Sequence, residues 1–258
     1  YRVPDKDGNV LVARFDSTIP VARLAASRYH DAKPPLRFCY MQSVYRPVEP
    51  KRGHSREFLQ VGMELIGLPA PAGDAETIEL LVAVLEAAGL NDFKIAIGDA
   101  RFFTEQLDAA NGSLDRETRE RVLAELQSRD MVGLQREMDA IGQFDDTQRE
   151  RLLAIAGARG GRDALDLYAA TRLSELDDLL RMAGVEDRVI YDLGLVRSLD
   201  YYTGTVLEVY VPSDGFPIGG GGRYDDLAGR FGRELAACGF AFNMERLHLA
   251  LMAERGDA

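Results

Sequence analysis

The chain has 258 residues, 46% of them hydrophobic, and a formal net charge of −11, so it can bury the core of one large domain or of one domain with an insertion. The acidic charge argues against DNA and tRNA as partners, because binding to nucleic acid depends on Lys and Arg that neutralise phosphates. The two cysteines and three histidines form no metal-ligand pattern, and neither a membrane span nor a signal peptide is evident, so we expect a cytoplasmic protein with reduced thiols and no metal or other cofactor.

The first third of the chain is predicted to consist mainly of strands. The DGN turn in YRVPDKDGNVLVARFD predicts a hairpin, so we expect the chain to start inside a fold, with an N-terminal part missing or disordered. Alternation predicts strands in VLVARFD, RFCYMQSVYR, FLQVGMELIG and FKIAIG, and TIPVARLAASRYH is predicted to be a short helix. A longer helix is expected from an Asp74 N-cap to Gly89.

Residues 99–184 change to helical periodicity, with capping residues and closing glycines, and their Phe, Leu and Met stripes are typical of core packing. Strands return from about residue 187 in RVIYDLGL, TGTVLEVYV, IGGGG and CGFAF, followed by a helix capped by Asn243. This order predicts an α+β fold around one antiparallel sheet. We expect residues 1–98 and 185–258 to form the core and residues 99–184 to form a helical insertion subdomain.

Two segments near the N-terminus carry candidate binding groups. Asp16 and Thr18, two residues apart in RFDST, would share one face of a strand. Arg46 and Arg56 flank the loop PVEPKRGHS, and the forked guanidinium of Arg suits phosphates or carboxylates, although exposed loop arginines would look the same.

The stretch GHSREFLQVGMELIG resembles the wall of a pocket. Gln60, Gly62 and Glu64 alternate with apolar residues, so one strand face would carry an amide and a carboxylate on either side of a glycine gap. We expect a ligand to occupy the space over Gly62.

Two further segments lie near the C-terminus. In LVRSLDYYTGTVLEVY, adjacent tyrosines in a strand would point to opposite faces, one toward the core and the other into a cleft with Arg197; ordinary aromatic packing is the alternative. The run IGGGGRYDDL indicates close approach by a ligand or another backbone, because consecutive glycines are otherwise costly. Arg246 would lie in the first turn of the last helix.

Considered together, these segments resemble motifs 2 and 3 of the class II aminoacyl-tRNA synthetases. RSLDYYTGTV and GGGRYDDL are similar to the two histidine motifs of histidyl-tRNA synthetase, and the resemblance covers residues of about 8–98 and 186–250. It implies a histidine-binding pocket of Asp16, Thr18, Gln60, Glu64, Arg197, Tyr202 and Tyr224. Within it, Asp16, Thr18 and Gln60 would hold the backbone end of the amino acid. Glu64 and Tyr202 would address the imidazole, and Arg197 would match the arginine used in forming the adenylate. Arg46 and Arg246 would match arginines that hold ATP phosphates, and Arg56 is a further possible phosphate contact.

The nucleotide side departs from the synthetase pattern. Val48 stands where the family usually has glutamate, His54 where it has arginine, and Asn243 where it has glycine. The chain ends twelve residues after Arg246, which we expect to leave no room for an anticodon-binding domain. These departures favour a protein that senses histidine without activating it, and ATP binding is doubtful.

The phrases LQVGMELIG, RDMVGLQREMDAIG and RSLDYYTGTVLEVY resemble the regulatory subunits of ATP phosphoribosyltransferase. That resemblance implies a dimeric, non-catalytic subunit that activates a short catalytic partner and takes part in feedback inhibition by histidine, at the first step of histidine biosynthesis. Two alternatives remain open. One is the catalytic core of a histidyl-tRNA synthetase, which would exchange pyrophosphate into ATP, and the other is a synthetase-like domain that binds another small amine or amino acid.

Overall fold

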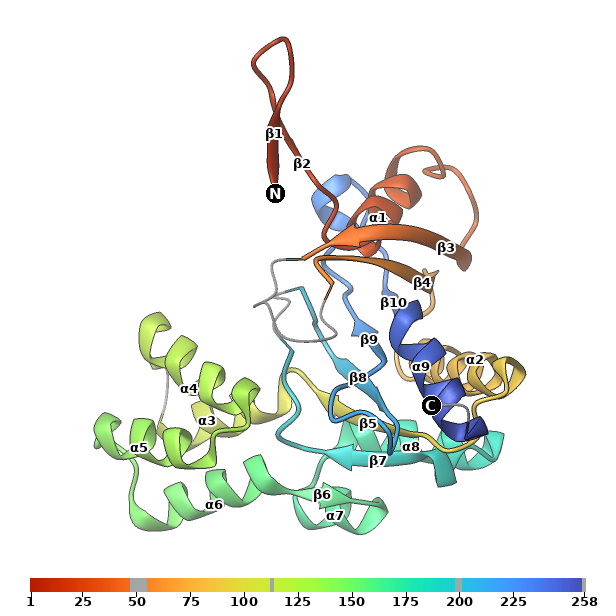
Figure 1. The fold of residues 1–258 in the computed structure, drawn as a ribbon. Coiled ribbons are helices and arrows are strands. Elements are labelled where there is room, and N and C mark those ends of the chain that lie inside the picture. Colours follow the sequence, from red (N-terminus) through yellow and green to blue (C-terminus); the bar gives the residue numbers. More distant parts are fainter. Residues whose placement is uncertain (47–54, 112–113, 198–200, 257–258) are drawn as a thin grey trace.

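The computed structural model describes residues 1–46, 55–111, 114–197 and 201–256, and the strands of this part of the chain form a small hairpin and one larger sheet (Figure 1). In spatial order the larger sheet contains β3 (Leu36–Tyr45), β4 (Glu57–Ile66), β10 (Ala237–Asn243), β9 (Gly219–Arg223), β8 (Thr205–Tyr210), β5 (Lys94–Asp99), β7 (Val189–Asp192) and β6 (Arg159–Gly160). The prediction of a single antiparallel sheet is correct except at one pair, because β5 and β7 are parallel. The helical region joins these two strands, and a parallel pair requires such a crossover.

Seven of the described helices fall into two groups. In Figure 1, α2 (Ala72–Ala88), α8 (Thr171–Ala183) and α9 (Met244–Arg255) lie together on one side of the sheet. A separate group on the other side of the view contains α3 (Phe102–Asn111), α4 (Arg116–Ser128), α5 (Met131–Ile141) and α6 (Asp146–Gly157). The remaining helical segments are α1 (Thr18–Ser27), α7 (Arg162–Leu167) and the 3₁₀ turns η1 (Glu186–Arg188) and η2 (Gly229–Phe231).

One hydrophobic cluster runs from the sheet into the helical region. It joins Ile97 and Leu207 of the sheet to Leu107, Leu152 and Leu180 of the helices, and all five side chains are buried. These helices bury their apolar faces against the same core as the sheet. We therefore propose that residues 99–184 form an insertion that packs against the rest of the domain.

The insertion is also fixed to the sheet by ion pairs on two buried aspartates. At the end of β7, Asp192 accepts hydrogen bonds from Arg129, which follows α4, and from Arg159 of β6, the latter with 2.9 Å between Nε and Oδ2. At the end of β5, Asp99 accepts from Arg172 of α8. Each aspartate therefore joins a strand end to the helices.

Two backbone hydrogen bonds join the helical region to residues that follow β7 and precede β8. Leu193 N–H donates to the carbonyl of Ala158 at 3.0 Å, and the carbonyl of Gly204 accepts from Ala100 N–H at 2.8 Å. Ala158 and Ala100 lie at the two ends of the helices α3–α6. Leu193 and Gly204 are therefore each fixed where the helical region meets the sheet.

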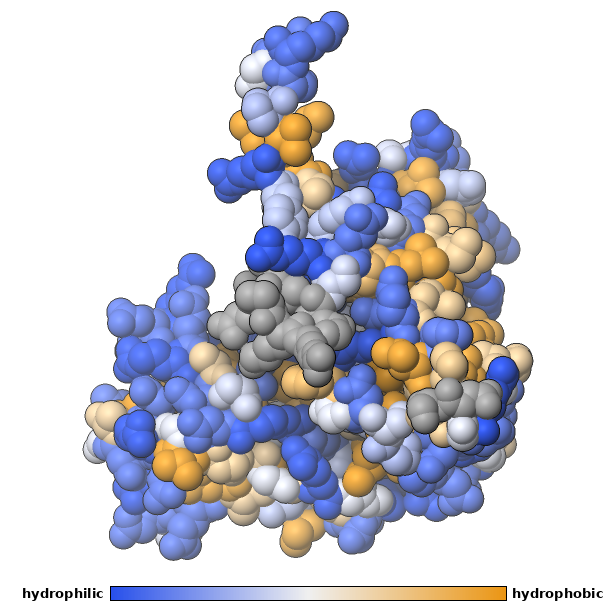
Figure 2. Space-filling model, in the orientation of Figure 1, coloured by the Kyte–Doolittle hydropathy of each residue, from blue (hydrophilic) through white to orange (hydrophobic). Residues whose placement is uncertain are grey.

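The N-terminal hairpin was predicted correctly but is shorter than VLVARFD suggests. Strand β1 (Arg2–Pro4) pairs with β2 (Val10–Val12), and all six strand residues are exposed. The hairpin projects away from the rest of the molecule (Figure 1), and Figure 2 shows an apolar area on it. An isolated two-stranded hairpin is at best marginally stable in water, and the apolar side chains of this one are exposed.

The predicted caps are correct at two helix ends and wrong at a third. Asn243 caps α9 by accepting from the backbone N–H of Arg246, as predicted, and Gly89 ends α2 with φ of +91°. The N-cap prediction for Asp74 is wrong, because α2 begins one turn earlier with Pro71 as its N-cap. Asp74 instead lies buried in the first turn, where its carboxylate pairs with Arg223.

Candidate functional site

A cavity of about 260 Å³ opens between the sheet and the side chains of Arg197, Tyr201 and Tyr202. Its walls come from β4, β9 and β10, and the start of α1 and the first turn of α9 close two of its sides. The volume lies below the ~300–1,000 Å³ that is usual for drug-sized ligands, so the cavity suits a small molecule.

Nine of the ten side chains predicted for the site line this cavity: Asp16, Thr18, Arg46, Gln60, Glu64, Arg197, Tyr202, Tyr224 and Arg246. They come from segments up to 230 residues apart in the chain, so only the fold brings them together. Arg56 is exposed and does not line the cavity; its backbone carbonyl accepts from Arg46 N–H at 2.9 Å. The departures at Val48 and His54 lie outside the described residues.

Glu64 forms the floor of the cavity and is enclosed by hydroxyl groups. Its side chain is 1% exposed. Thr18 donates to Oε1 at 2.8 Å, Tyr40 donates to the same oxygen at 3.2 Å, and Tyr224 donates to Oε2. Among the described residues no Lys, Arg or His forms an ion pair with this carboxylate. Burial raises the pKa of Glu64 to about 8, and the three hydroxyl hydrogen bonds oppose this rise.

A second buried carboxylate, Asp16, also lines the cavity. It is 3% exposed, accepts from the Tyr201 hydroxyl at 3.1 Å, and accepts from the backbone N–H of Ile19 at 3.3 Å. Burial raises its pKa above the usual value. Gln60 accepts from the backbone N–H of Ser17 at 3.2 Å and so fixes the turn that carries Asp16. Two buried carboxylates without an ionic partner in the described part of the chain favour a ligand with basic groups.

Two local predictions are wrong although the residues do meet in the cavity. Asp16 and Thr18 do not share a strand face, because Asp16 precedes α1 and Thr18 is the first residue of that helix. Tyr201 and Tyr202 do not lie in a strand; they precede β8, and both rings line the cavity with their centroids 4.9 Å apart. Without the regular alternation of a strand, neighbouring side chains can face the same side.

Three arginines border the cavity, and each is fixed by a backbone carbonyl. Arg197 donates to Leu207 O at 2.8 Å and its guanidinium lies 5.7 Å from the Tyr202 ring centroid. Arg46 donates to Phe15 O at 2.9 Å, and Arg246 donates to Pro217 O at 3.0 Å. These contacts leave part of each guanidinium fork for an anionic group.

The glycine run in β9 lets a neighbouring strand approach closely, as predicted, and also makes room for a side chain, which was not predicted. A Cβ on Gly220 would lie 1.9 Å from Nη1 of Arg197, and one on Gly221 would lie 2.0 Å from the carbonyl oxygen of Gly239. The first glycine therefore makes room for a cavity arginine, and the second lets β9 and β10 pair beneath it.

The space over Gly62 is not free for a ligand, contrary to the prediction. Tyr40 of β3 lies opposite Gly62 in the sheet register, and a Cβ on Gly62 would be 2.5 Å from the Tyr40 hydroxyl oxygen and 2.7 Å from its ring. The glycine therefore accommodates the phenol of the neighbouring strand.

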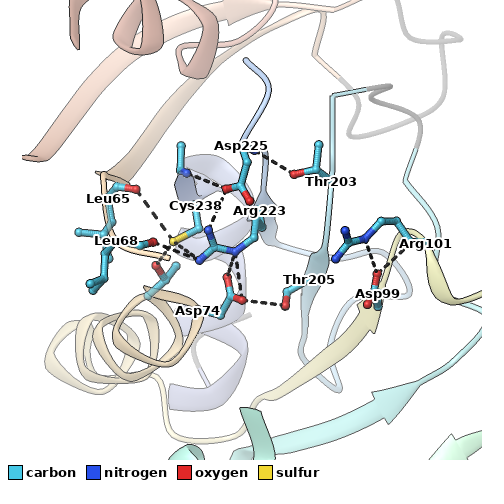
Figure 3. Close-up of polar contacts among 12 residues, drawn as sticks. Leu65, Leu68, Asp74, Asp99, Arg101, Thr203, Thr205, Arg223, Asp225 and Cys238 are labelled. Atoms are coloured by element: carbon cyan, nitrogen blue, oxygen red, sulfur yellow. Dashed lines mark hydrogen bonds and ion pairs between the residues drawn. The ribbon is translucent and has the colours of Figure 1, made fainter. Parts of the chain in front are cut away.

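A buried polar network supports the strand segment next to Tyr224 (Figure 3). The guanidinium of Arg223 lies between Asp74 and Asp225 and donates to both carboxylates, with Nε to Asp74 Oδ1 at 2.9 Å. Asp74 also accepts from Thr205 of β8. The network joins α2, β8 and β9, and so fixes the backbone that places Tyr224 over Glu64.

Sequence reasoning missed two tyrosines of the site. Tyr201 was treated as a possible core residue, and Tyr40 was not considered. The strand pairing could have found Tyr40: if RFCYMQSVYR and FLQVGMELIG are adjacent antiparallel strands, a residue opposite Gly62 is a diagonal neighbour of Glu64.

Within the described residues no group of three or more His, Cys, Asp or Glu side chains could hold a metal ion. The helices of this part of the chain are also too short or too polar to cross a bilayer.

The family model described as histidyl-tRNA synthetase matches residues 1–247. A protein named ATP phosphoribosyltransferase regulatory subunit, from Moorella thermoacetica, is 41% identical over 97% of this chain and 66% of its own length. The chain thus spans about two thirds of the length of the curated relatives it matches.

Two solved structures are also similar to this chain over nearly its whole length. A Bacillus halodurans protein, described as an ATP phosphoribosyltransferase regulatory subunit/histidyl-tRNA synthetase, superposes with a TM-score of 0.89 at 34% identity, over 97% of this chain and 67% of that one. A histidine–tRNA ligase subunit from Alicyclobacillus acidocaldarius has a TM-score of 0.78 at 30% identity, over 99% of this chain and 80% of its own. The class II synthetase-like fold expected from the sequence is confirmed.

Proposed function

Because this chain belongs to the family of ATP phosphoribosyltransferase regulatory subunits, which share the fold of histidyl-tRNA synthetase, we propose that it binds histidine and regulates a short catalytic subunit of ATP phosphoribosyltransferase. It is itself non-catalytic: it activates the partner, and histidine bound in the cavity reverses that activation. The partner catalyses the first step of histidine biosynthesis, and both proteins work in the cytoplasm.

The observation that carries this proposal is the pair of buried carboxylates, Asp16 and Glu64, in one small cavity. Histidine has two basic groups, an ammonium and an imidazole. The ammonium needs acceptors, and Asp16 with Gln60 provides a carboxylate and an amide oxygen. The imidazole offers one donor and one acceptor when neutral. Glu64 and the phenol of Tyr202 complement both edges.

The carboxylate of histidine needs a cationic partner, and the cavity has three arginines at its border. Arg197 is the best placed of them for an amino acid, because it lies against Tyr202 while Arg46 and Arg246 are fixed near Phe15 and Pro217. Its fork donates one hydrogen bond to Leu207 O and keeps further N–H groups for the ligand.

Feedback requires that histidine bind one state of the assembly more tightly than the other. Two contacts are suited to such coupling. Leu193, four residues before Arg197, and Gly204, two residues after Tyr202, are each hydrogen-bonded to an end of the helical insertion. A change in how the insertion packs would move Arg197 and Tyr202, and the affinity for histidine would change with it.

The test is to mix this chain with a short-form catalytic subunit and measure turnover of ATP and phosphoribosyl pyrophosphate, with and without histidine. We expect turnover to rise on mixing and to fall when histidine is added. A Glu64→Gln variant should still activate the partner but should need a higher concentration of histidine for the same inhibition. If the mixture is no more active than the catalytic subunit alone, the proposal is wrong.

The second candidate is the catalytic core of a histidyl-tRNA synthetase. The specific observation that favours it is the presence of Arg46 and Arg246 at the cavity border, where they could hold ATP phosphates. This candidate requires histidine-dependent exchange of pyrophosphate into ATP. Robust exchange by the purified chain would overturn the regulatory function, and its absence together with activation of the partner would exclude the synthetase.

We also propose that the chain forms a dimer through the N-terminal hairpin. Val3, Val10, Leu11 and Val12 are all more than half exposed there, and burial of such residues by a second copy would stabilise the hairpin. Sedimentation of the full chain should show a dimer that Val12→Asp dissociates. Leu249→Asp, at an equally exposed position on α9, should leave it intact. A monomeric wild type would contradict this assembly.

A further inference from the structure

Tyr40 is a buried tyrosine that does not line the cavity and still contacts its floor. The residue lies on β3, is 9% exposed, and stands opposite Gly62 of β4. Its hydroxyl reaches across the space over Gly62 and donates to Glu64 Oε1 at 3.2 Å. Any side chain at position 62 would displace the phenol, so the tyrosine and the glycine form one structural unit.

The hydroxyl of Tyr40 completes the set of donors on one oxygen of Glu64. Oε1 accepts from both Thr18 and Tyr40, and Oε2 accepts from Tyr224. A carboxylate oxygen has about two lone-pair directions, so Oε1 is fully used and Oε2 has one direction left. The donors come from α1, β3 and the segment after β9, and together they fix the rotation of the carboxylate.

We propose that Tyr40 is a positioning residue of the cavity, whose hydroxyl turns the Glu64 carboxylate so that the free lone-pair direction on Oε2 can accept a hydrogen bond from a ring N–H of the ligand. This inference rests on the proposed binding of histidine and names the element that sets its specificity. Tyr40 acts through Glu64 and makes no contact with the ligand.

The role of Tyr40 can be measured through the titration of Glu64, because a hydrogen bond to the charged carboxylate lowers the pKa of Glu64. Removing this hydroxyl should move the titration of Glu64 to higher pH. The other titratable or charged groups facing Glu64 are Asp16 before α1, Tyr201 and Tyr202 before β8, Tyr224 after β9, and Cys238 of β10. Burial raises the pKa of each tyrosine among them, so these phenols stay protonated near neutral pH and contribute no titration there.

The experiment compares Tyr40→Phe with Tyr45→Phe, a matched control on the same strand whose hydroxyl donates to the exposed Glu57. Histidine binding to the full chain is measured by calorimetry between pH 6 and 9. We expect Tyr40→Phe to weaken binding about 10-fold above pH 8, where the Glu64 carboxyl is ionised, since a hydrogen bond to a charged group contributes about 1.5–3 kcal/mol and 1.4 kcal/mol is a factor of ten. Tyr45→Phe should bind like the wild type.

One further measurement separates a positioning role from loss of structure. In a Glu64→Gln background, Tyr40→Phe should cause no shift in the pH profile, because the titrating group is gone. An equal shift in both backgrounds would overturn the inference. A Tyr40→Phe variant that binds histidine as tightly as the wild type, with the same pH profile, would also overturn it.

A readout without ligand keeps this inference separate from the proposed function. NMR titration of ¹³C-labelled glutamate carboxyls, with Glu64→Gln to identify the Glu64 signal, follows the carboxyl in the free chain. Tyr40→Phe should move that titration to higher pH and Tyr45→Phe should not. If the wild type fails to bind histidine, the proposed function is wrong, and this titration alone decides whether Tyr40 controls Glu64.

Discussion

The guanidinium of Arg223 and the carboxylate of Asp74 form an ion pair from which water is excluded, with side chains that are 2% and 4% exposed. The pair joins β9 to the first turn of α2, and Asp225 and Thr205 complete its hydrogen bonds (Figure 3). Arg223 immediately precedes Tyr224, which donates to Glu64. The same residue that holds the sheet to the helix therefore also sets the backbone position of a cavity tyrosine.

Replacing Arg223 with Met should destabilise the chain by about 3–5 kcal/mol, because Asp74 would then be a buried charge without a partner. The double variant Arg223→Met with Asp74→Asn should recover part of that loss. Urea unfolding of both variants measures the free energies. A loss below about 1 kcal/mol in the single variant would show that the pair is not important for stability.

Replacing Glu64 with Ala should weaken histidine binding by about 10- to 100-fold, since a buried imidazole N–H left without its partner costs about 1–3 kcal/mol. Calorimetry at pH 7 measures the change. Glu57→Ala, in the same strand but exposed, is the control that should bind normally. Unchanged affinity in Glu64→Ala would refute the assignment of this carboxylate to the imidazole.

The stability of the ligand-free chain should fall as pH rises from about 5 to 8. Glu64 has its pKa raised to about 8 by burial, so in this range the folded chain holds a proton that the unfolded chain has released. Stability then decreases with pH, because the folded state binds more protons than the unfolded state. Urea unfolding at several pH values should show this slope, and Glu64→Gln should flatten it. An equal slope in the variant would assign the effect to other groups such as Asp16.

Gly220→Ala should displace Arg197, because the added methyl would lie 1.9 Å from its Nη1 and 2.7 Å from Leu207 O. We expect weaker histidine binding together with a stability loss of about 1–3 kcal/mol, which is usual for overpacking. Gly215→Ala, where the methyl meets no atom within 4 Å, serves as the control. Calorimetry and urea unfolding of both variants test the expectation, and normal binding by Gly220→Ala would contradict it.

Asp192→Ala should loosen the helical insertion, because it removes the buried partner of Arg129 and Arg159. Amide hydrogen exchange should become faster in α4 and α6, and the free energy of unfolding should fall by about 1–3 kcal/mol. Glu120→Ala removes a surface pair with Arg116 on α4 and should change stability by less than about 0.5 kcal/mol. Equal exchange rates in the two variants would argue against Asp192 as an anchor.

Most of the fold follows from periodicity. The long strands β3 and β4 and the capped helices have strong local patterns, so alternation and capping residues were enough to find them. The parallel pairing of β5 with β7 has no local signal, because it is set by how the crossover helices pack. The cap of α2 was misplaced for a related reason: Asp74 resembles an N-cap in sequence, but its carboxylate is used by Arg223, 149 residues away.

The site was predictable where residues lie on regular strands and less so elsewhere. Gln60 and Glu64 share a face of β4 and were found from alternation. Tyr201 and Tyr202 precede a strand, so the expectation of opposite faces failed. The space over Gly62 was assigned to a ligand because a single strand shows the gap and not its neighbour; only the register with β3 reveals that Tyr40 fills it.

The hydrogen bonds at Leu193 and Gly204 have a mechanical consequence. Both belong to the junction between the sheet and α3–α6. Arg197 follows the first of these residues by four positions, and Tyr202 precedes the second by two. A partner that displaced these helices would therefore displace both cavity residues without entering the cavity.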